Sequence, residues 1–138
     1  MNGRFRYTKS VKVVLGLVMI FALQSCTSSN AQSPQVKRIS NEELQTLLAK
    51  SNIQLVDVRT PQEYAQGHLA NSQLIDFTRP DFKEKISQLD KDQPIVVYCA
   101  VGGRSASATN VLKSAGFKEI YDLQRGIRGW LAAGLPVE

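Results

Sequence analysis

Cys99 is the residue of this sequence whose surroundings point most directly to covalent chemistry. It follows the apolar run 94–98 and precedes two adjacent glycines, an arginine and a serine. Adjacent glycines allow backbone conformations closed to other residues, so successive N–H groups can turn toward one centre. Amides arranged in this way at the start of a helix bind anions and lower the pKa of a thiol. We therefore expect Cys99 to be a nucleophilic thiolate. The loop expected to surround it consists of Ala100, Val101, Gly102, Gly103, Arg104 and Ser105.

Arg104 adds a fixed cation to this loop. Because a guanidinium presents its donors in a rigid fork, it could hold the loop in place or bind an anionic substrate. The plainer alternative is that Cys99 is a small buried residue and that Gly102 and Gly103 form a simple turn. The cysteine, the glycine pair, the arginine and a helix start occur together here, and this combination favours the reactive interpretation.

Asp57, Arg59 and His68 are supporting candidates for the same site. Asp57 and Arg59 end an earlier apolar run, and we expect them to form ion pairs, with Arg59 reaching Glu63 if the next helix begins early enough. His68 is the only histidine of the chain. It could be a general base for Cys99, but we favour a structural hydrogen-bonding role, because a thiolate held by amides needs no base.

Alternating apolar and amphipathic segments predict the elements that position this loop. A capping box begins a helix at Ser40 with Glu43 as its third residue, and Pro61 suits the first position of a second helix that Gly67 ends. Further helices are expected at 81–89, 105–115 and 127–133, and strands at 53–58, 72–77, 94–98 and 119–123. Repeated strand–helix units predict a mainly parallel sheet with helices on both faces.

The N-terminal residues account for the basic charge of the chain. The formal net charge is +5, but four of the 17 Lys and Arg precede the apolar run Val13–Leu23, which leaves 13 against 12 Asp and Glu from Cys26 onward. A domain so close to neutrality predicts no nucleic-acid partner. One histidine and two cysteines outside any Cys-x-x-Cys pair predict no metal site, and no cofactor is expected.

The same N-terminal segment has the features of a targeting signal. Its apolar run of 11 residues is shorter than the about 20 residues that a membrane-spanning helix needs, and basic residues precede it. The run ends in Leu23-Gln24-Ser25-Cys26, which resembles a bacterial lipobox, although Gln24 is unusual there. We therefore expect a signal peptide at 1–25, lipidation of Cys26, a flexible tether at 26–35 and one domain at 36–138.

Lipidation at Cys26 would place the domain in a bacterial cell envelope, outside the cytoplasm and attached to a membrane through its N-terminal lipid. Cleavage after Ala31 is the alternative, and it would release a soluble periplasmic protein. The plainest alternative is an N-terminus that is not cleaved.

Three motifs in order resemble those of the rhodanese family. The segment Cys99–Ser105, Cys-Ala-Val-Gly-Gly-Arg-Ser, resembles the active loop of that family. Asp57-Val58-Arg59 with Gly67-His68-Leu69 resembles an earlier signature, and Gly126-Ile127-Arg128-Gly129-Trp130 resembles a C-terminal one. The resemblance implies an α/β fold, with a five-stranded, mainly parallel sheet and helices on both faces. It also implies a sulfurtransferase in which Cys99 takes sulfane sulfur from thiosulfate or a persulfide donor.

The resemblance further implies that the Cys99 persulfide passes its sulfur to a nucleophilic acceptor, such as cyanide, a thiol or a thioredoxin-like protein. Two departures from the family pattern bear on this. Ala100 replaces the arginine common just after the cysteine, so recruitment of anionic thiosulfate is expected to be weaker. Arg125 replaces a glycine that usually precedes Gly126. Arg125 and Arg128 could line the rim of the pocket, and the default alternative is that they are solvated charges of a helix.

Two other functions use related features. Cell-cycle dual-specificity phosphatases resemble rhodaneses but have five residues between the cysteine and the arginine, whereas Cys99 and Arg104 enclose four. A shorter loop forms a smaller cradle, which suits one terminal sulfur better than a phosphoryl group. The second alternative is a sulfur-carrier or binding module that uses the thiol stoichiometrically and does not turn over.

Overall fold

The structure, a computed structural model, describes residues 33–50 and 52–138. The expected signal peptide and the expected lipidation site Cys26 lie outside these residues. The elements follow one another in the order β1 (Gln35–Ile39), α1 (Asn41–Leu48), β2 (Gln54–Asp57), α2 (Pro61–Tyr64), β3 (Gln73–Leu74), α3 (Phe82–Ser87), β4 (Ile95–Tyr98), α4 (Gly103–Ala115), β5 (Glu119–Leu123) and α5 (Gly126–Ala132).

The strands form one five-stranded sheet in the order β1-β5-β4-β2-β3. Every neighbouring pair is parallel, so the carboxyl ends of all strands meet at one edge. β4 lies at the centre of the sheet and is completely buried, as its continuous β-branched run predicts. The expected α/β fold with a parallel sheet is confirmed. Cys99, which follows β4, is thereby delivered to the middle of the carboxyl edge.

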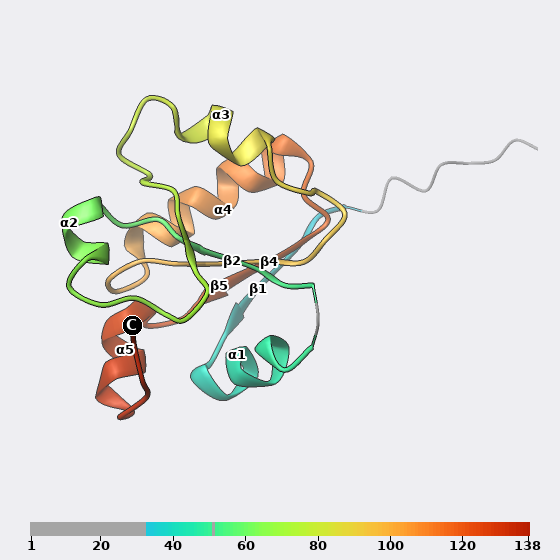
Figure 1. The fold of residues 1–138 in the computed structure, drawn as a ribbon. Helices are drawn as coiled ribbons and strands as arrows, with labels where there is room; N and C mark the ends of the chain where they lie inside the picture. The colour runs from blue at the N-terminus through green and yellow to red at the C-terminus, as the bar shows by residue number, and fades with distance from the viewer. Residues whose placement is uncertain (1–32, 51) are drawn as a thin grey trace, which may run out of the picture. The chain divides into compact units, whose positions relative to one another are not determined.

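Helices cover both faces of the sheet (Figure 1). The side chains of β2, β4 and β5 alternate between two cores. The core under α3 and α4 includes Val56, Phe82, Ile86, Ile95, Val97, Leu112, Phe117 and Ile120. The core under α1 and α5 includes Ile39, Leu44, Leu55, Val96, Tyr98, Leu123, Ile127 and Trp130. Since burial of apolar surface is the main force that favours folding, these two layers hold the carboxyl edge of the sheet in place.

The edge strand β1 is the element that the apolar pattern does not predict. Of its five residues only Ile39 is buried, because one side of an edge strand faces solvent. The segment is not predicted as a strand because its apolar residues do not alternate with a period of two. Its partner is β5, with Arg38 opposite Asp122. β3 is also shorter than the expected 72–77 segment, and it pairs with β2 over two residues at the other edge.

The predicted helix starts agree with the structure where a local cap defines them. Ser40 and Glu43 form the expected capping box of α1, and Thr60 and Glu63 form another one at α2. α4 differs, because it begins at Gly103 and not at Ser105. The glycine pair and Arg104 therefore belong to the first turn of the helix or its N-cap. For that reason the backbone amides at the start of α4 lie next to Cys99.

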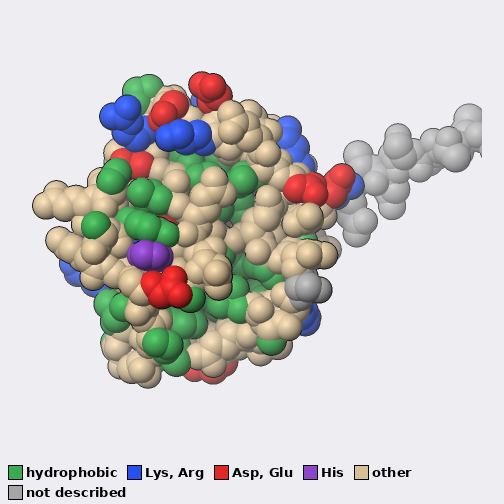
Figure 2. All heavy atoms as spheres, viewed as in Figure 1, with side chains coloured by type: hydrophobic (Ala, Val, Ile, Leu, Met, Phe, Trp, Pro, Cys, Tyr) green, Lys and Arg blue, Asp and Glu red, His purple; other side chains and the backbone are tan. Residues whose placement is uncertain are grey.

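The surface of the domain mixes charges of both signs. Figure 2 shows basic and acidic side chains together over the α3 side of the visible face, not one sign gathered in a single patch. Within residues 33–50 and 52–138, the helices are too short or too polar for any of them to cross a bilayer.

Candidate active site

Cys99 lies at the carboxyl end of β4 with only 1% of its surface exposed. Its Sγ accepts a hydrogen bond from the N–H of Gly102 at 3.1 Å. Burial by itself would raise the pKa of the thiol. The backbone N–H and the hydroxyl of Ser105, together with the N–H groups of Gly102 and Val101, outweigh burial and lower the pKa below the ordinary value. The arrangement favours a thiolate, which is the nucleophilic form of cysteine.

The conformation of Gly102 allows its amide to point at the sulfur. Gly102 is the N-cap of α4 and has a φ of +105°, which a residue with a Cβ adopts only with strain. α4 is 13 residues long, so the partial positive charge of its first turn adds to the attraction of the amides for an anion. The hydroxyl oxygen of Ser105 lies 3.2 Å from the carbonyl oxygen of Gly102, and its one proton can turn to that carbonyl or to the sulfur of Cys99.

The first turn of α5 holds the other side of the loop. The N–H groups of Ile127 and Arg128 donate to the carbonyls of Cys99 and Ala100 at 2.9 and 3.1 Å. Gly126 approaches the loop so closely that a Cβ there would lie 2.3 Å from the carbonyl oxygen of Cys99. Its φ is +54°. The resemblance singled out the Gly126–Trp130 segment, and the structure shows its physical role: its backbone orients the carbonyls away from the sulfur.

Arg104 holds the loop to α2. Its guanidinium donates two parallel hydrogen bonds to Glu63, from Nη1 to Oε2 at 2.7 Å and from Nη2 to Oε1 at 2.6 Å. This pairing, with some opposition from burial and further help from Thr60, lowers the pKa of Glu63 to about 2. Of the two roles open to Arg104, the structure supports the holding one, because its fork is occupied by a carboxylate.

Asp57 and Arg59 form the expected ion pair, and both are buried. Arg59 Nη2 lies 2.6 Å from Asp57 Oδ2 and also donates to the carbonyl of Gly67 at 2.7 Å. The ion pair expected between Arg59 and Glu63 does not form. α2 begins at Pro61 with Thr60 as its N-cap, so Arg59 precedes the helix and Glu63 turns to Arg104.

Tyr98 connects β4 to the segment after α2, and sequence reasoning did not single it out. Its hydroxyl accepts a hydrogen bond from the N–H of Leu69 at 3.1 Å and lies 2.9 Å from the hydroxyl of Ser72. Burial raises the pKa of Tyr98 far above its ordinary value. A single tyrosine at a strand end has no distinctive sequence signal, because its partners come from a distant loop.

The contacts of His68 are structural, which agrees with the hydrogen-bonding role that the sequence favours over a general base. Its ring stacks on Tyr64 with centroids 3.7 Å apart, and Nδ1 lies 3.2 Å from the carbonyl oxygen of Tyr64. Its backbone exchanges two hydrogen bonds with Glu138, at 2.8 and 2.9 Å. These contacts anchor the end of the described chain to the loop that holds Arg59.

One pocket of about 290 Å³ lies beside the active loop. Ala100 contributes the loop side of it, and Val101, at the tip of the loop, is 59% exposed. The other lining residues are Arg59, Glu63, Gln66, Gly67, Ile127, Arg128, Leu131 and Val137. A small anionic or polar molecule fits such a pocket by size and by its mixture of charged and apolar walls.

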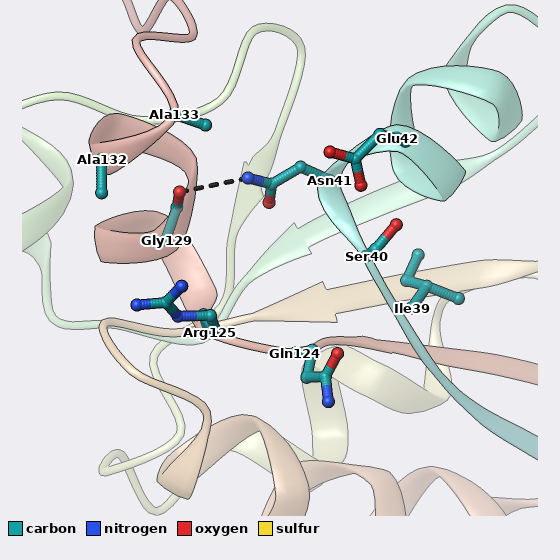
Figure 3. A pocket seen from close by; sticks show the side chains of 9 residues that line it. All are labelled: Ile39, Ser40, Asn41, Glu42, Gln124, Arg125, Gly129, Ala132 and Ala133. Carbon is teal, nitrogen blue, oxygen red and sulfur yellow. Dashed lines mark hydrogen bonds between the residues drawn. The ribbon is translucent and has the colours of Figure 1, made fainter.

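A second pocket, of about 300 Å³, lies at the carboxyl ends of β1 and β5 (Figure 3). Arg125 lines this pocket and not the one beside Ala100, whereas Arg128 lines the one beside Ala100. Of the two rim candidates, only Arg128 therefore meets the expectation. The amide of Asn41 crosses the pocket wall and donates to the carbonyl of Gly129 at 3.1 Å, which ties α1 to α5.

The fold and the loop geometry can be compared with known proteins. The model of the rhodanese-like domain matches residues 40–133 of the chain. The chain belongs to the rhodanese-like family. Relatives of this rhodanese-like domain include a sulfurtransferase of Allochromatium vinosum, 34% identical over 74% of this chain and 94% of the relative. Another is a thiosulfate sulfurtransferase, GlpE, of Ectopseudomonas mendocina, 37% identical over 71% of this chain and 87% of the relative.

Solved structures give the same family. A rhodanese-related protein from Thermoplasma volcanium superposes with a TM-score of 0.66 and 33% identity, over 74% of this chain and 97% of that one. The polysulfide-sulfur transferase homodimer from Wolinella succinogenes gives a TM-score of 0.63 and 32% identity, over 78% of this chain and 81% of that one. The similarity spans 81% and 97% of the length of these two proteins, so this chain shares the rhodanese-like fold with them.

Within residues 33–50 and 52–138, no group of His, Cys, Asp and Glu side chains is arranged to hold a metal ion. The reactive group that the described site presents is the Cys99 sulfur, which accepts a hydrogen bond from the Gly102 N–H.

Proposed function

We propose that this sulfurtransferase moves sulfane sulfur from thiosulfate or a persulfide donor to a thiophilic acceptor through a persulfide on Cys99. The observation that carries the proposal is the sulfur atom of Cys99 held by the Gly102 amide at the start of α4, with a lowered thiol pKa. The names of the relatives, sulfurtransferase and thiosulfate sulfurtransferase, support the same class of reaction.

The first half-reaction loads the enzyme. The Cys99 thiolate attacks the outer sulfur of thiosulfate, an S–S bond forms to Cys99, and the bond between the two sulfurs of thiosulfate breaks. Sulfite leaves with the electron pair of that bond. The persulfide that remains carries its negative charge on the outer sulfur, where amides of the loop stabilise it.

The second half-reaction unloads the enzyme. A nucleophile such as cyanide or a thiolate attacks the outer sulfur, and the S–S bond to Cys99 breaks. The Cys99 thiolate leaves with the electron pair, which restores the starting enzyme. Because the leaving thiolate is the ionised form that the loop already favours, the same amides assist both steps. A small thiol or a thioredoxin-like protein is the acceptor we propose in the cell.

Incubation with thiosulfate followed by mass spectrometry tests the first step. We expect one added sulfur on the wild type and none on Cys99→Ser. Release of thiocyanate in the presence of cyanide then tests turnover. Loading without repeated turnover would instead identify a sulfur-carrier module. Hydrolysis of an aryl phosphate that is lost in Cys99→Ser would identify a phosphatase and contradict the proposal.

We also propose that the protein is exported and attached to a membrane through a lipid on Cys26. The basic start, the short apolar run and the lipobox-like Leu23–Cys26 segment support this proposal. Cys26→Ala is expected to move the protein from the membrane fraction to the soluble fraction. The mass of the mature protein distinguishes the alternatives, because lipidation at Cys26, cleavage after Ala31 and an intact N-terminus each give a different value.

A further inference from the structure

Arg38 of β1 lies at the active loop, although it is 61 positions before Cys99 in the chain. It is the register partner of Asp122 in the β1–β5 pair, and its Nε lies 3.4 Å from Asp122 Oδ2. Its Nη2 is the one heavy atom within 4 Å of the place where a Cβ on Gly102 would lie, at 3.4 Å. Gly102 is the residue whose N–H donates to Cys99 Sγ. The guanidinium therefore lies at the Gly102 corner of the cradle.

Asp122 is the buried carboxylate that lies next to that guanidinium. Its side chain is 3% exposed, and its Oδ1 has no hydrogen-bond partner. A buried carboxylate with an unpartnered oxygen is costly, and Arg38 is the cation that faces it. Asp122 Oδ2 lies 3.4 Å from Arg38 Nε, while 58% of the Arg38 side chain remains exposed. The exposed side chain of Arg38 therefore lies beside the loop.

Two of the other arginines that contact the site are already neutralised, and Arg128, which lines the pocket beside Ala100, is the competing cation. Arg59 is 6% exposed and bound to Asp57, and both terminal nitrogens of Arg104 are bound to Glu63. Residue 100, directly after the cysteine, is an alanine. The largely exposed side chain of Arg38 can thus supply a cation that the loop itself does not offer.

We propose that Arg38 is a specificity-determining residue that binds the anionic group of the sulfur donor at the Gly102 corner of the loop, and that Asp122 is the positioning residue for it. For sulfur transfer the inference rests on the proposed function. The donor it selects is one whose leaving group carries a negative charge, as a sulfonate or carboxylate does. Such groups match a guanidinium in both charge and geometry.

Alkylation of Cys99 tests the inference without any sulfur transfer. The thiolate displaces iodide from iodoacetate, an anion, or from iodoacetamide, a neutral molecule of similar size, and forms a thioether in both cases. We expect Arg38→Gln to lower the rate ratio of iodoacetate to iodoacetamide by about fivefold or more, mostly through the anionic reagent. Asp122→Asn is expected to lower the ratio by about twofold to threefold, because the guanidinium is no longer held.

Two arginine variants and one double variant complete the experiment. Arg79→Gln removes an exposed charge near α3, where Arg79 pairs with Asp81, and it should leave the ratio within about twofold of wild type. Arg38→Gln combined with Asp122→Asn removes the uncompensated buried charge, and it should keep the low ratio in a folded protein. An unchanged ratio in both Arg38 variants overturns the inference. So does a loss confined to Arg128→Gln, or an equal loss in Arg79→Gln.

Steady-state kinetics separate this inference from the proposed function. If the wild type transfers sulfur, Arg38→Gln should raise the KM for thiosulfate by about fivefold or more with little change in kcat. A wild type that never loads sulfur would refute the proposed function, while the alkylation ratio would still decide the role of Arg38. A wild type that turns over, with both KM and ratio unchanged in Arg38→Gln, would refute the role of Arg38 alone.

Discussion

At the scale of single residues, the site depends on how opposing effects on one sulfur atom balance. Burial at 1% exposure disfavours a charged thiolate, and hydrogen bonds from the loop favour it. The hydrogen bonds prevail because several donors converge on one acceptor, and because most of them are backbone N–H groups already fixed by the helix start. The reactivity of Cys99 is therefore a property of its neighbours.

The pH dependence of alkylation measures that balance. The rate of Cys99 with iodoacetamide is expected to reach half its maximum below pH about 8.5, the pKa of a free cysteine. Ser105→Ala removes one donor to the sulfur and keeps the backbone N–H, so the midpoint should move upward. Ser107→Ala, an exposed serine of the same helix, is the matched control and should leave the midpoint in place. A midpoint equal to that of free cysteine would contradict the lowered pKa.

The Glu63–Arg104 pair carries a second prediction at this scale. Glu63→Gln is expected to lower the free energy of unfolding by about 1 to 3 kcal/mol at pH 7, because two charge-assisted hydrogen bonds are weakened. The pKa of Glu63 in the fold is about 2. The stabilisation is therefore fully present above the unfolded pKa of about 4.3 and is lost as the pH falls toward 2.

Urea unfolding at several pH values checks this prediction. The difference between wild type and Glu63→Gln should shrink steadily below pH about 4. Glu84→Gln changes an exposed glutamate of α3 and should cost less than about 0.5 kcal/mol throughout. A difference that is independent of pH would mean that the ionised pair does not contribute.

At the scale of elements, two helices define the loop from opposite sides. The N-cap and first turn of α4 supply N–H groups that face the sulfur, and the first turn of α5 binds the carbonyls of Cys99 and Ala100. Donors are thus turned inward and acceptors outward. Gly126 is required where the backbone of α5 passes the backbone of Cys99 and Ala100, because a Cβ there would overlap it.

Gly126→Ala is expected to disrupt this arrangement. A Cβ at residue 126 would overlap the backbone of Cys99 and Ala100, which cannot move without opening the loop. The expected cost is about 3 kcal/mol or more, with a rise in the pKa of Cys99. Gly134→Ala is the matched control, because Gly134 also has a positive φ, +72°, but has no atom within 4 Å of the Cβ position. It should cost about 1 kcal/mol and leave the alkylation profile unchanged.

At the scale of the whole molecule, stability is concentrated at the centre of the sheet. β4 lies between β5 and β2 and is packed by helices on both faces, whereas β1 has solvent on one side. Val97→Ala is expected to cost about 2 kcal/mol or more, because it leaves a cavity in a completely buried strand. Val36→Ala, in the exposed edge strand, should cost less than about 0.5 kcal/mol.

Thermal unfolding and amide hydrogen exchange check the difference between centre and edge. The amides of β4 should exchange the slowest, by global unfolding, and those of β1 faster, by local opening. Equal costs for the two valine substitutions would contradict the layered core. A stable centre matters for function because Cys99 is attached directly to the end of β4.

The sequence by itself determined the features that depend on neighbours in the chain. The capping box at Ser40, the helix start at Pro61, the buried run of β4 and the α/β order follow from local patterns, since helix caps and side-chain periodicity act over a few residues. The Cys99–Ser105 motif likewise identifies the reactive loop, because its residues are adjacent in the chain. The Asp57–Arg59 pair, two positions apart, was predictable for the same reason.

Only the tertiary structure decided which distant groups meet at that loop. It paired Arg104 with Glu63, brought Gly126 against Cys99, and placed Arg38 of an unpredicted edge strand beside Gly102. None of these contacts has a local signal, because each joins residues that are close only after the strands have paired and both faces of the sheet are covered. The sequence specifies the reactive atom and its local cradle, and long-range packing specifies the charges that surround it.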